Sequence, residues 1–329
     1  MMELGGAEIA GIKMHAAIDV TMRRNHIHHC TMGIWCDWEA QGTRLSQNLL
    51  HDNQRPPFAS VLKGGMMSQD IFVEVGHGPT LIDNNIMLSD ASLRFATEGV
   101  ALVHNLICGA LTCVGGGTGP RYTPYHMPHR TEVMGFMTVL HGDDRFYNNI
   151  FVQKWPSDDI ITMHDSDDGF DTENRAAGTW MFDEYPTYDE WISQFDFSKP
   201  ADMAKLYGAH EGKLPVWIEG NAYLGGAKPS KKDVNALISA VAREDVRVEL
   251  VQKEDGYYLD TNVYELIEGF KNRMIDSDVL GKAFEPEERF ENPDGTAIRF
   301  DSDYFGTHRG VDVIPGPFAS KEEAAKKLY

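Results

Sequence analysis

The 329-residue sequence contains no apolar run that approaches the roughly 20 residues of a membrane-spanning helix. Basic residues are also scarce, because 30 Lys and Arg stand against 50 Asp and Glu, for a formal net charge of −20. That charge opposes binding to nucleic-acid phosphates and to anionic lipid surfaces, but it does not oppose a neutral ligand. We therefore expect a partner that is neither a nucleic acid nor a membrane.

Cysteines are few and show no zinc-ligand spacing. The chain has four, Cys30, Cys36, Cys108 and Cys113, which are most simply interpreted as reduced thiols in the core. The first residues lack the basic and apolar segments of a secretory signal, which favours a cytoplasmic protein. The Gly-rich segment 115–120 lacks the strand–Lys–helix context of a phosphate loop, so no nucleotide and no other cofactor is expected.

An Asn followed by two apolar or nearly apolar residues recurs along the first half of the chain. The Asn residues are Asn25, Asn48, Asn85, Asn105 and Asn149, at steps of 23, 37, 20 and 44 residues. The step of 44 is close to two steps of 22, and the step of 37 becomes ordinary if residues 54–67 are an insertion. A period in the low twenties, made of short β segments, is typical of a solenoid. We predict an all-β fold, a right-handed parallel β-helix with a small α+β C-terminal region, in which the Asn amides bond the backbone from coil to coil.

The same pattern predicts the organisation of the chain. Residues 1–153 are expected to form the coils that carry the active site, residues 154–215 inserted loops and short helices, and residues 216–329 the last coil and an α+β cap. Capping signals predict short helices after Thr187 and Ser320 and a longer one from Asn262 to Met274. Because the sequence begins inside a repeat, we expect it to be the C-terminal part of a longer protein.

Alternation within the predicted strands divides their side chains between two faces. The expected interior residues are Ile34, Cys36, Ile71, Val73, Val75, Leu93, Phe95, Met137 and Val139. The expected solvent-facing residues are Trp35, Asp37, Phe72, Glu74, Arg94 and Thr138.

Two acids occupy the same place in successive repeats. Asp37 lies eleven residues before Asn48, and Glu74 lies eleven residues before Asn85. Neighbouring strands are about 4.8 Å apart, which suits the roughly 5–5.5 Å between the carboxyls of retaining glycosidases better than the 6.5–9.5 Å of inverting ones. By the same count, Arg94 should lie beside Glu74, where its charge would lower the pKa of this carboxyl.

Other functions remain open on these residues. A β-helical polysaccharide lyase would use stacked acids to hold calcium, although the acidic composition is unfavourable for a uronate polymer. A non-catalytic carbohydrate-binding solenoid is the third possibility. The segment Asp165–Asp171 faintly resembles a calcium loop without its twelfth-position Glu, and His28 is expected to stack on His51 rather than to hold zinc with His29. We expect no metal at the acid pair.

Several long segments resemble the β-xylosidases of glycoside hydrolase family 120. They are Gly6-Ala-Glu8-Ile-Ala-Gly-Ile-Lys13, Gly33-Ile-Trp-Cys-Asp37-Trp-Glu-Ala-Gln-Gly-Thr-Arg44, Asp70-Ile-Phe-Val-Glu74-Val-Gly-His-Gly-Pro79, Arg121-Tyr-Thr-Pro-Tyr-His126, and Asp303-Tyr-Phe-Gly306 with Pro315-Gly-Pro-Phe318. The resemblance implies a retaining exo-enzyme that releases xylose from β-1,4-xylo-oligosaccharides. It implies that Asp37 is the nucleophile, Glu74 the acid/base and Glu8 a third active-site acid. It also implies an N-terminal half, with earlier coils and a β-sandwich, that this sequence lacks.

Residues from these segments and from the following loop are the candidates for sugar binding. They are Trp35, Trp38, His77, Arg94, Arg121, Tyr122, His126 and His129. Aromatic rings suit the apolar faces of a sugar, and Arg, Tyr and His side chains suit its hydroxyls. For residues 121–130 an ordinary polar surface loop remains an equal alternative. The expected partners are a small xylo-oligosaccharide and either a second copy of the chain or the missing N-terminal half.

Overall fold

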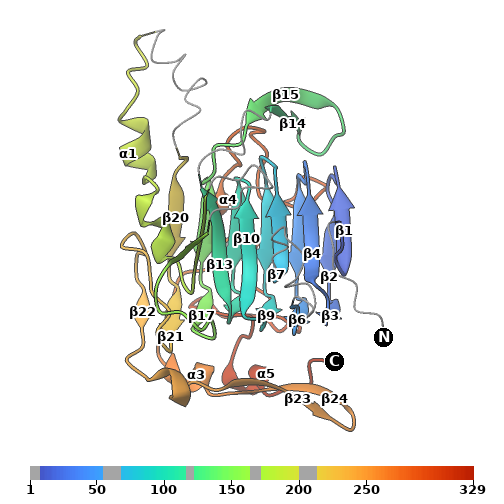
Figure 1. The fold of residues 1–329 in the computed structure, drawn as a ribbon, viewed down its shortest axis with the longest axis vertical. Coiled ribbons are helices and arrows are strands. Elements are labelled where there is room, and N and C mark those ends of the chain that lie inside the picture. The colour runs from blue at the N-terminus through green and yellow to red at the C-terminus, as the bar shows by residue number, and fades with distance from the viewer. Residues whose placement is uncertain (1–7, 55–67, 116–121, 164–171, 200–212) are drawn as a thin grey trace.

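The computed structural model describes residues 8–54, 68–115, 122–163, 172–199 and 213–329, and most of its regular structure is β-strand (Figure 1). The strands are β1 (Ile12–His15), β2 (Thr21–Arg23), β3 (His26–His28), β4 (Met32–Asp37), β5 (Thr43–Ser46), β6 (Leu49–His51), β7 (Gln69–Glu74), β8 (Thr80–Asp83), β9 (Ile86–Met87), β10 (Ala91–Ala96), β11 (Val100–Val103), β12 (Leu106–Ile107), β13 (Ala110–Gly115), β14 (Tyr122–His126), β15 (Val133–Thr138), β16 (Asp144–Tyr147), β17 (Ile150–Val152), β18 (Ile161–Met163), β19 (Thr172–Ala176), β20 (Val216–Glu219), β21 (Ala222–Leu224), β22 (Leu237–Ile238), β23 (Val248–Lys253) and β24 (Gly256–Thr261). The helices are η2 (Trp180–Glu184), α1 (Tyr188–Ile192), η3 (Arg243–Asp245), α3 (Val263–Leu266), α4 (Ser277–Leu280) and α5 (Lys321–Ala324).

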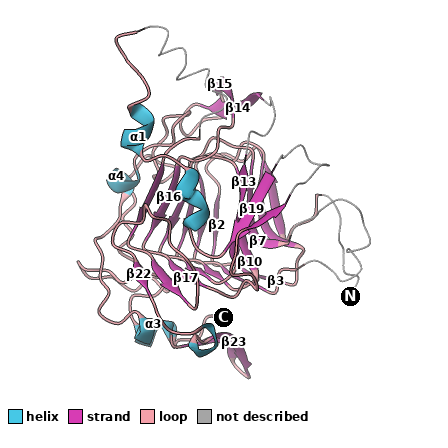
Figure 2. Ribbon diagram, turned by 60° about the vertical axis from the view of Figure 1, so that its left-hand side comes forward, coloured by secondary structure: helices cyan, strands magenta, loops and turns pink. Residues whose placement is uncertain are grey.

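Successive strands of each repeat go to three different sheets. The first sheet has the order β1-β4-β7-β10-β13-β19-β18, the second β2-β5-β8-β11-β16-β20, and the third β22-β21-β17-β12-β9-β6-β3. Neighbours in the second and third sheets are parallel, as are the pairs from β1 to β13 in the first. Figure 2 shows these layers from the side. As a result, equivalent residues of successive repeats lie next to each other in a sheet.

The interior between the sheets follows the predicted alternation over β4, β7 and β10. Ile34 pairs with Ile71 and Cys36 with Val73 across β4 and β7, and Phe95 of β10 pairs with Val73. All five are at most 2% exposed and belong to one apolar cluster. Fully burying an aliphatic or aromatic side chain contributes about 1.5–3 kcal/mol, so this column is a main source of stability.

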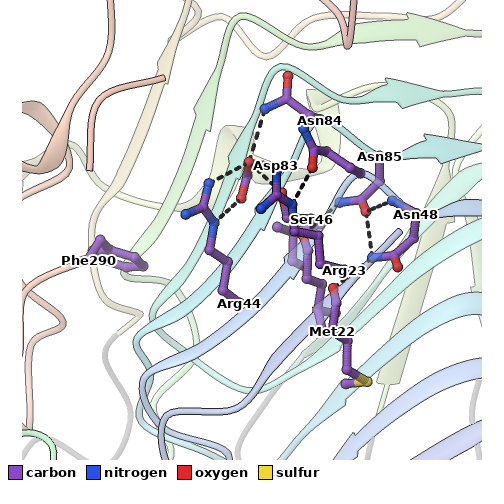
Figure 3. A network of polar contacts seen from close by, with 12 residues as sticks. Met22, Arg23, Arg44, Ser46, Asn48, Asp83, Asn84, Asn85 and Phe290 are labelled. Atoms are coloured by element: carbon purple, nitrogen blue, oxygen red, sulfur yellow. Dashed lines mark hydrogen bonds and ion pairs between the residues drawn. The ribbon is translucent and has the colours of Figure 1, made fainter. Parts of the chain in front are cut away.

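An asparagine ladder runs along the corner between the second and third sheets, as the repeat predicted. Asn48 Nδ2 donates to Asn85 Oδ1 at 3.0 Å and to the Met22 carbonyl at 3.1 Å (Figure 3). The same bonds continue through Asn105 and Asn149 to Asn221. Each of these Asn side chains therefore bonds a backbone carbonyl of the preceding repeat and the Asn side chain of the next, which confirms the predicted role. The predicted stacking of His28 on His51 is also confirmed, since their rings are 4.9 Å apart and 7° from parallel.

The prediction of a single right-handed parallel β-helix requires correction. The described strands form five sheets rather than one clear solenoid, and in the first sheet β19 runs antiparallel to both β13 and β18. β14 and β15 form a separate antiparallel hairpin. The arrangement is one of layered, mostly parallel sheets with few helices. The physical reason is that the regular repeat of the first sheet ends at β13: β14 and β15 pair with each other and β19 returns antiparallel, while β16 and β17 still continue the second and third sheets in parallel.

Several side-chain positions, before and after β13, also differ from the prediction. Met137 and Thr138 belong to the hairpin strand β15, not to a coil. Val139 and Val75 join an apolar cluster with Trp35 and Phe72 on the outer face of the first sheet. That face was expected to meet solvent, but Trp35 is 7% and Phe72 2% exposed. The outer face is therefore a second, covered layer.

The C-terminal region is mostly irregular, with one β-hairpin and short helices. The helix predicted from Asn262 to Met274 is wrong in length, because α3 ends at Leu266. Two of the three capping signals are confirmed: Thr187 and Glu190 form a reciprocal capping box, and the Ser320 side chain accepts from the Glu323 amide. The third is wrong, because the Asn262 side chain makes no capping hydrogen bond to α3. Among the described residues, no helix is both long and apolar enough to cross a membrane.

Candidate active site

The acid pair lies at the ends of two neighbouring strands. Asp37 is the last residue of β4, and Glu74 is the last residue of β7. The parallel register that joins Trp35 to Phe72 and Cys36 to Val73 leads directly to these two acids. Side chains on adjacent parallel strands at the same level lie about one strand spacing apart, so the two carboxyls share one site. The sequence prediction that they are neighbours is consistent with this register.

Glu74 is held by the aromatic side chains of the same face. The Trp35 indole Nε1 donates to Glu74 Oε2 at 2.9 Å, and the Trp35 ring stacks on Phe72 with centroids 5.4 Å apart. Burial and the nearby Asp37 raise the pKa of Glu74 to about 7, while the Trp35 bond and Arg94 oppose that rise. Glu74 can therefore hold a proton near neutral pH, which is what a general acid requires.

Lys13 is the residue of the site that the sequence did not single out. Its ammonium lies 2.7 Å from Asp37 Oδ2 and 3.7 Å from the centre of the Trp35 ring. Lys13 also forms an ion pair with Glu8, whose side chain is 70% exposed. Lys13 pairs with Trp35 in the register of β1 and β4, which the eleven-residue count does not give, because it would place Met14 rather than His15 beside Asp37. Glu8, the third predicted acid, is therefore linked to Asp37 through this lysine.

The predicted position of Arg94 requires correction. Arg94 pairs with Phe72, and Ala96 is the residue that pairs with Glu74. Its guanidinium lies over the Phe72 ring at 4.6 Å. Counting back eleven residues from the ladder Asn assumed turns of constant length. Five residues separate β7 from β8 (75–79), but only three separate β10 from β11 (97–99).

Trp38 follows Asp37 and turns away from the strand. Its φ of 29° is in the left-handed region, and its ring stacks on His15 with centroids 6.1 Å apart. His15 pairs with Asp37 in the register of β1 and β4. An aromatic side chain thus borders the acid pair on the turn after β4, which suits a sugar ring.

His77 is buried in polar contacts of its own. Its Nδ1 lies 2.6 Å from Glu98 Oε1 and its Nε2 lies 3.1 Å from the Thr123 carbonyl. Both partners are acceptors, so the ring is best satisfied when it carries two protons. Burial favours the neutral ring, but Glu98 outweighs it and raises the pKa of His77. His77 joins the turn after β7 to the hairpin strand β14.

The loop candidates divide between described and undescribed residues. His126 exchanges two backbone hydrogen bonds with the Gln41 side chain, and its Nε2 lies 3.6 Å from Glu39 Oε2. His129 contacts Asp19 and Glu291 instead. Tyr122 begins β14, paired with Thr138. Arg121 lies outside the described residues, as do residues 55–67, 116–120 and 165–171 of the predicted loops. The sugar-binding roles of all eight candidates stay predictions.

A cavity of about 380 Å³ lies elsewhere, on the second sheet. It is lined by Thr21, Arg23, Arg44, Ser46, Gln47, Asp83, Asn84, Asn292, Ala297, Ile298, Arg299, Phe300 and Ser302. Its buried acid is fully engaged, because Asp83 receives hydrogen bonds from Arg44 at 2.7 and 3.0 Å and from Ser46 at 3.0 Å (Figure 3). The cavity shares no residue with the acid pair, and we do not assign the reaction to it.

Comparison with known proteins gives one informative structural likeness. No protein-family model matches the chain, and no curated protein matches it. The solved complex of XylC with xylose is similar, with a TM-score of 0.80 and 33% sequence identity. The match covers 99% of this chain and 45% of XylC, so the chain spans less than half the length of that protein. XylC is a protein whose structure contains xylose, and its likeness to this chain includes nearly every residue described above.

Proposed function

We propose that the chain acts as a retaining glycoside hydrolase of the β-xylosidase type, related to glycoside hydrolase family 120. The observation that carries the proposal is the placement of Asp37 and Glu74 at the ends of adjacent strands, one strand spacing apart. A separation near 5 Å suits a mechanism in which one carboxylate attacks the sugar directly, because no water fits between. The likeness to XylC supports xylose as the sugar released, and β-1,4-xylo-oligosaccharides as the substrates.

In the first step, a carboxylate oxygen of Asp37 attacks the anomeric carbon as the glycosidic C–O bond breaks. Glu74 gives its proton to the departing oxygen, so the leaving group departs as a neutral alcohol. The raised pKa of Glu74, caused first by burial and then by Asp37, keeps that proton available near neutral pH. The product of the step is a xylosyl ester on Asp37.

In the second step, water attacks the same carbon and the ester bond breaks, returning Asp37 to its ionised form. Glu74 is now the base that takes the proton of the water. Esterification removes the charge of Asp37, and with it one of the causes that raise the pKa of Glu74. The acid pair therefore adjusts Glu74 to the role that each step requires.

Two neighbouring side chains support these roles. Lys13 lies 2.7 Å from Asp37 Oδ2 and fixes the orientation of the carboxylate that attacks. Trp35 donates to Glu74 at 2.9 Å and favours the ionised form that the second step needs. A cytoplasmic location remains part of the proposal, and the buried free thiols of Cys36, Cys108 and Cys113 suit a reducing compartment.

The test is hydrolysis of xylobiose and of an aryl β-xyloside by the purified chain and its variants. Asp37→Ala should abolish turnover of both. Glu74→Ala should lose xylobiose hydrolysis but keep formation of the ester from the activated aryl substrate, and added azide should restore its turnover as β-xylosyl azide. Glu132→Gln, an exposed change on the hairpin, serves as the control and should retain wild-type rates.

Two results would contradict the proposal. If wild-type protein released no xylose from either substrate, the chain by itself would not be a xylosidase. If azide gave β-xylosyl azide with Asp37→Ala instead of with Glu74→Ala, the two acids would have the opposite roles.

A further inference from the structure

Asp19, His129 and Glu288 come together from three distant parts of the chain. Asp19 lies in the turn before β2, His129 in the turn of the β14–β15 hairpin, and Glu288 in the loop after α4. One ligand atom from each lies within 4.8 Å of the others, and among the described residues this is the one such group of His, Cys, Asp or Glu. None of the three belongs to the acid pair, so the group requires its own explanation.

Glu288 is the strongest sign that something is bound there. It is 1% exposed, and among the described residues its Oε1 finds no hydrogen-bond partner. Its other oxygen accepts from Gln41 Nε2 at 2.7 Å, so the carboxylate is held with Oε1 directed at the group. An unsatisfied buried carboxylate oxygen is costly, which indicates a missing cation or donor.

Gly42 lies beside both carboxylates, and its φ of 63° also favours glycine at this position. A methyl group added to Gly42 would clash with Asp19 Oδ1 and lie 2.8 Å from Glu288 Oε1. Both oxygens thus face the same small volume beside a residue that has no side chain. His129 closes the third side, with Nδ1 2.9 Å from Asp19 Oδ1.

We propose that Asp19, His129 and Glu288 bind a divalent first-row transition-metal ion, with Zn²⁺ as the best fit. One imidazole nitrogen and two carboxylate oxygens with a fourth position for water is a set that zinc accepts. Bonds of about 2.0–2.1 Å in a tetrahedron separate ligand atoms by about 3.3–3.4 Å, which the group reaches with small adjustments. Calcium fits less well, since it takes six to eight oxygen ligands.

The surroundings supply the outer contacts that such a site needs. Glu291 Oε1 lies 3.4 Å from His129 Nε2, so when Nδ1 binds the metal the other ring nitrogen can donate to a carboxylate. Gln41 orients Glu288 and also donates to the His126 carbonyl at 2.9 Å. The ion would join the hairpin and the C-terminal region to the turn before β2. Its role is structural, and it is independent of the proposed hydrolysis.

The test is binding of Zn²⁺ to tag-free, chelator-stripped protein, measured by isothermal titration calorimetry and by the shift in melting temperature. Wild type should bind one ion at this site and melt at a higher temperature with zinc. Glu288→Gln and His129→Gln should each weaken binding by at least tenfold, since even outer-shell partners account for about 10–100-fold. Glu287→Gln, the exposed neighbour with the same charge change, should bind as wild type does.

A second variant tests whether zinc binds instead at the cluster of His26, His28, His29 and His51. His51→Gln changes a ring whose Nε2 lies 2.7 Å from His26 Nε2, and it should leave zinc binding unchanged. Co²⁺ provides a readout that does not depend on stability, because four-coordinate Co²⁺ absorbs visible light far more strongly than the aqueous ion. That absorption should appear with wild type and be lost with His129→Gln. Equal binding by wild type, Glu288→Gln and His129→Gln, or loss with His51→Gln alone, would overturn the proposal.

Discussion

The coupling between Asp37 and Glu74 can be measured directly by removing one charge. Asp37→Asn keeps the size and most hydrogen bonds of the side chain but removes its negative charge. Because Asp37 raises the pKa of Glu74, the variant should lower that pKa from about 7. The direction follows from like-charge repulsion, since a neutral neighbour makes ionisation of Glu74 easier.

The magnitude follows from the register. Two unit charges about 4.8 Å apart at an effective dielectric of about 20 interact by about 3.5 kcal/mol, or about 2.5 pKa units. That figure is an upper limit, because Glu74 is only partly buried and solvent screens the pair. Burial is also the larger cause of the rise. We therefore expect the pKa of Glu74 to fall by about one unit, to about 6.

The assay is a pH titration of protein labelled with ¹³C at the glutamate side-chain carboxyls. The Glu74 resonance is assigned by its absence in Glu74→Gln, and Glu132→Gln provides the control for an equal charge change at an exposed position. A Glu74 pKa that moves by less than about 0.3 units in Asp37→Asn would refute the close pairing of the two carboxylates. It would also refute the direct-attack mechanism, which depends on that pairing.

Three further predictions follow from the same contacts. Trp35→Phe removes the hydrogen-bond donor to Glu74, and a hydrogen bond to a charged group is worth about 1.5–3 kcal/mol. The pKa of Glu74 should therefore rise, and the falling limb of kcat/KM against pH for xylobiose should move from about pH 7 to about pH 8. An unmoved limb, or an equal shift in Phe72→Leu, would contradict this. Arg94→Met removes a cation that lowers the pKa of Glu74, so Glu74 should be less ionised as the base of the second step. Deglycosylation should therefore slow more than glycosylation, which would be measured as a larger burst of aglycone. An unchanged burst with a slower first step would limit Arg94 to binding. Asn105→Ala removes hydrogen bonds to Asn85, Asn149 and the Ile82 carbonyl, and it should lower the free energy of unfolding, measured in urea, by about 3 kcal/mol. Asn25→Ala, at the end of the ladder, should lower it by only about 1 kcal/mol. Equal losses would show that the ladder does not act as a unit.

The parts of the structure that could be predicted from the sequence are those that repeat. The Asn ladder, the interior column from Ile34 to Phe95 and the neighbouring positions of Asp37 and Glu74 all follow from residues at equal offsets in successive repeats. A repeated offset predicts register well because each strand must match the one before it. The prediction failed where one turn was two residues shorter, which moved Arg94 from Glu74 to Phe72.

The fold beyond β13 could be predicted only in part. Asn149 and Asn221 continue the ladder there, but the segments between them are single, and a segment without a repeat has no register to copy. Met137 and Val139 have the alternation of a coil strand, yet residues 133–138 pair with β14 in a hairpin. Pairing partners in such a region depend on tertiary contacts, which alternation alone does not encode. For the same reason, the Asp19, His129 and Glu288 group has no spacing signal, since its members are more than 100 residues apart.

The outer face of the first sheet is buried, which the sequence did not predict, and this burial affects the protonation of Glu74. The sequence placed Trp35, Phe72 and the acids in solvent, and a solvated Glu74 would have no reason to hold a proton at neutral pH. The structure buries this face in an apolar cluster that includes Val114 of β13 and Val139, which follows β15. Burial is the first cause of the raised pKa of Glu74, and Asp37 is the second. The repeats therefore place the two carboxyls side by side, and burial of the face that they share raises the pKa of Glu74 far enough for it to act as an acid.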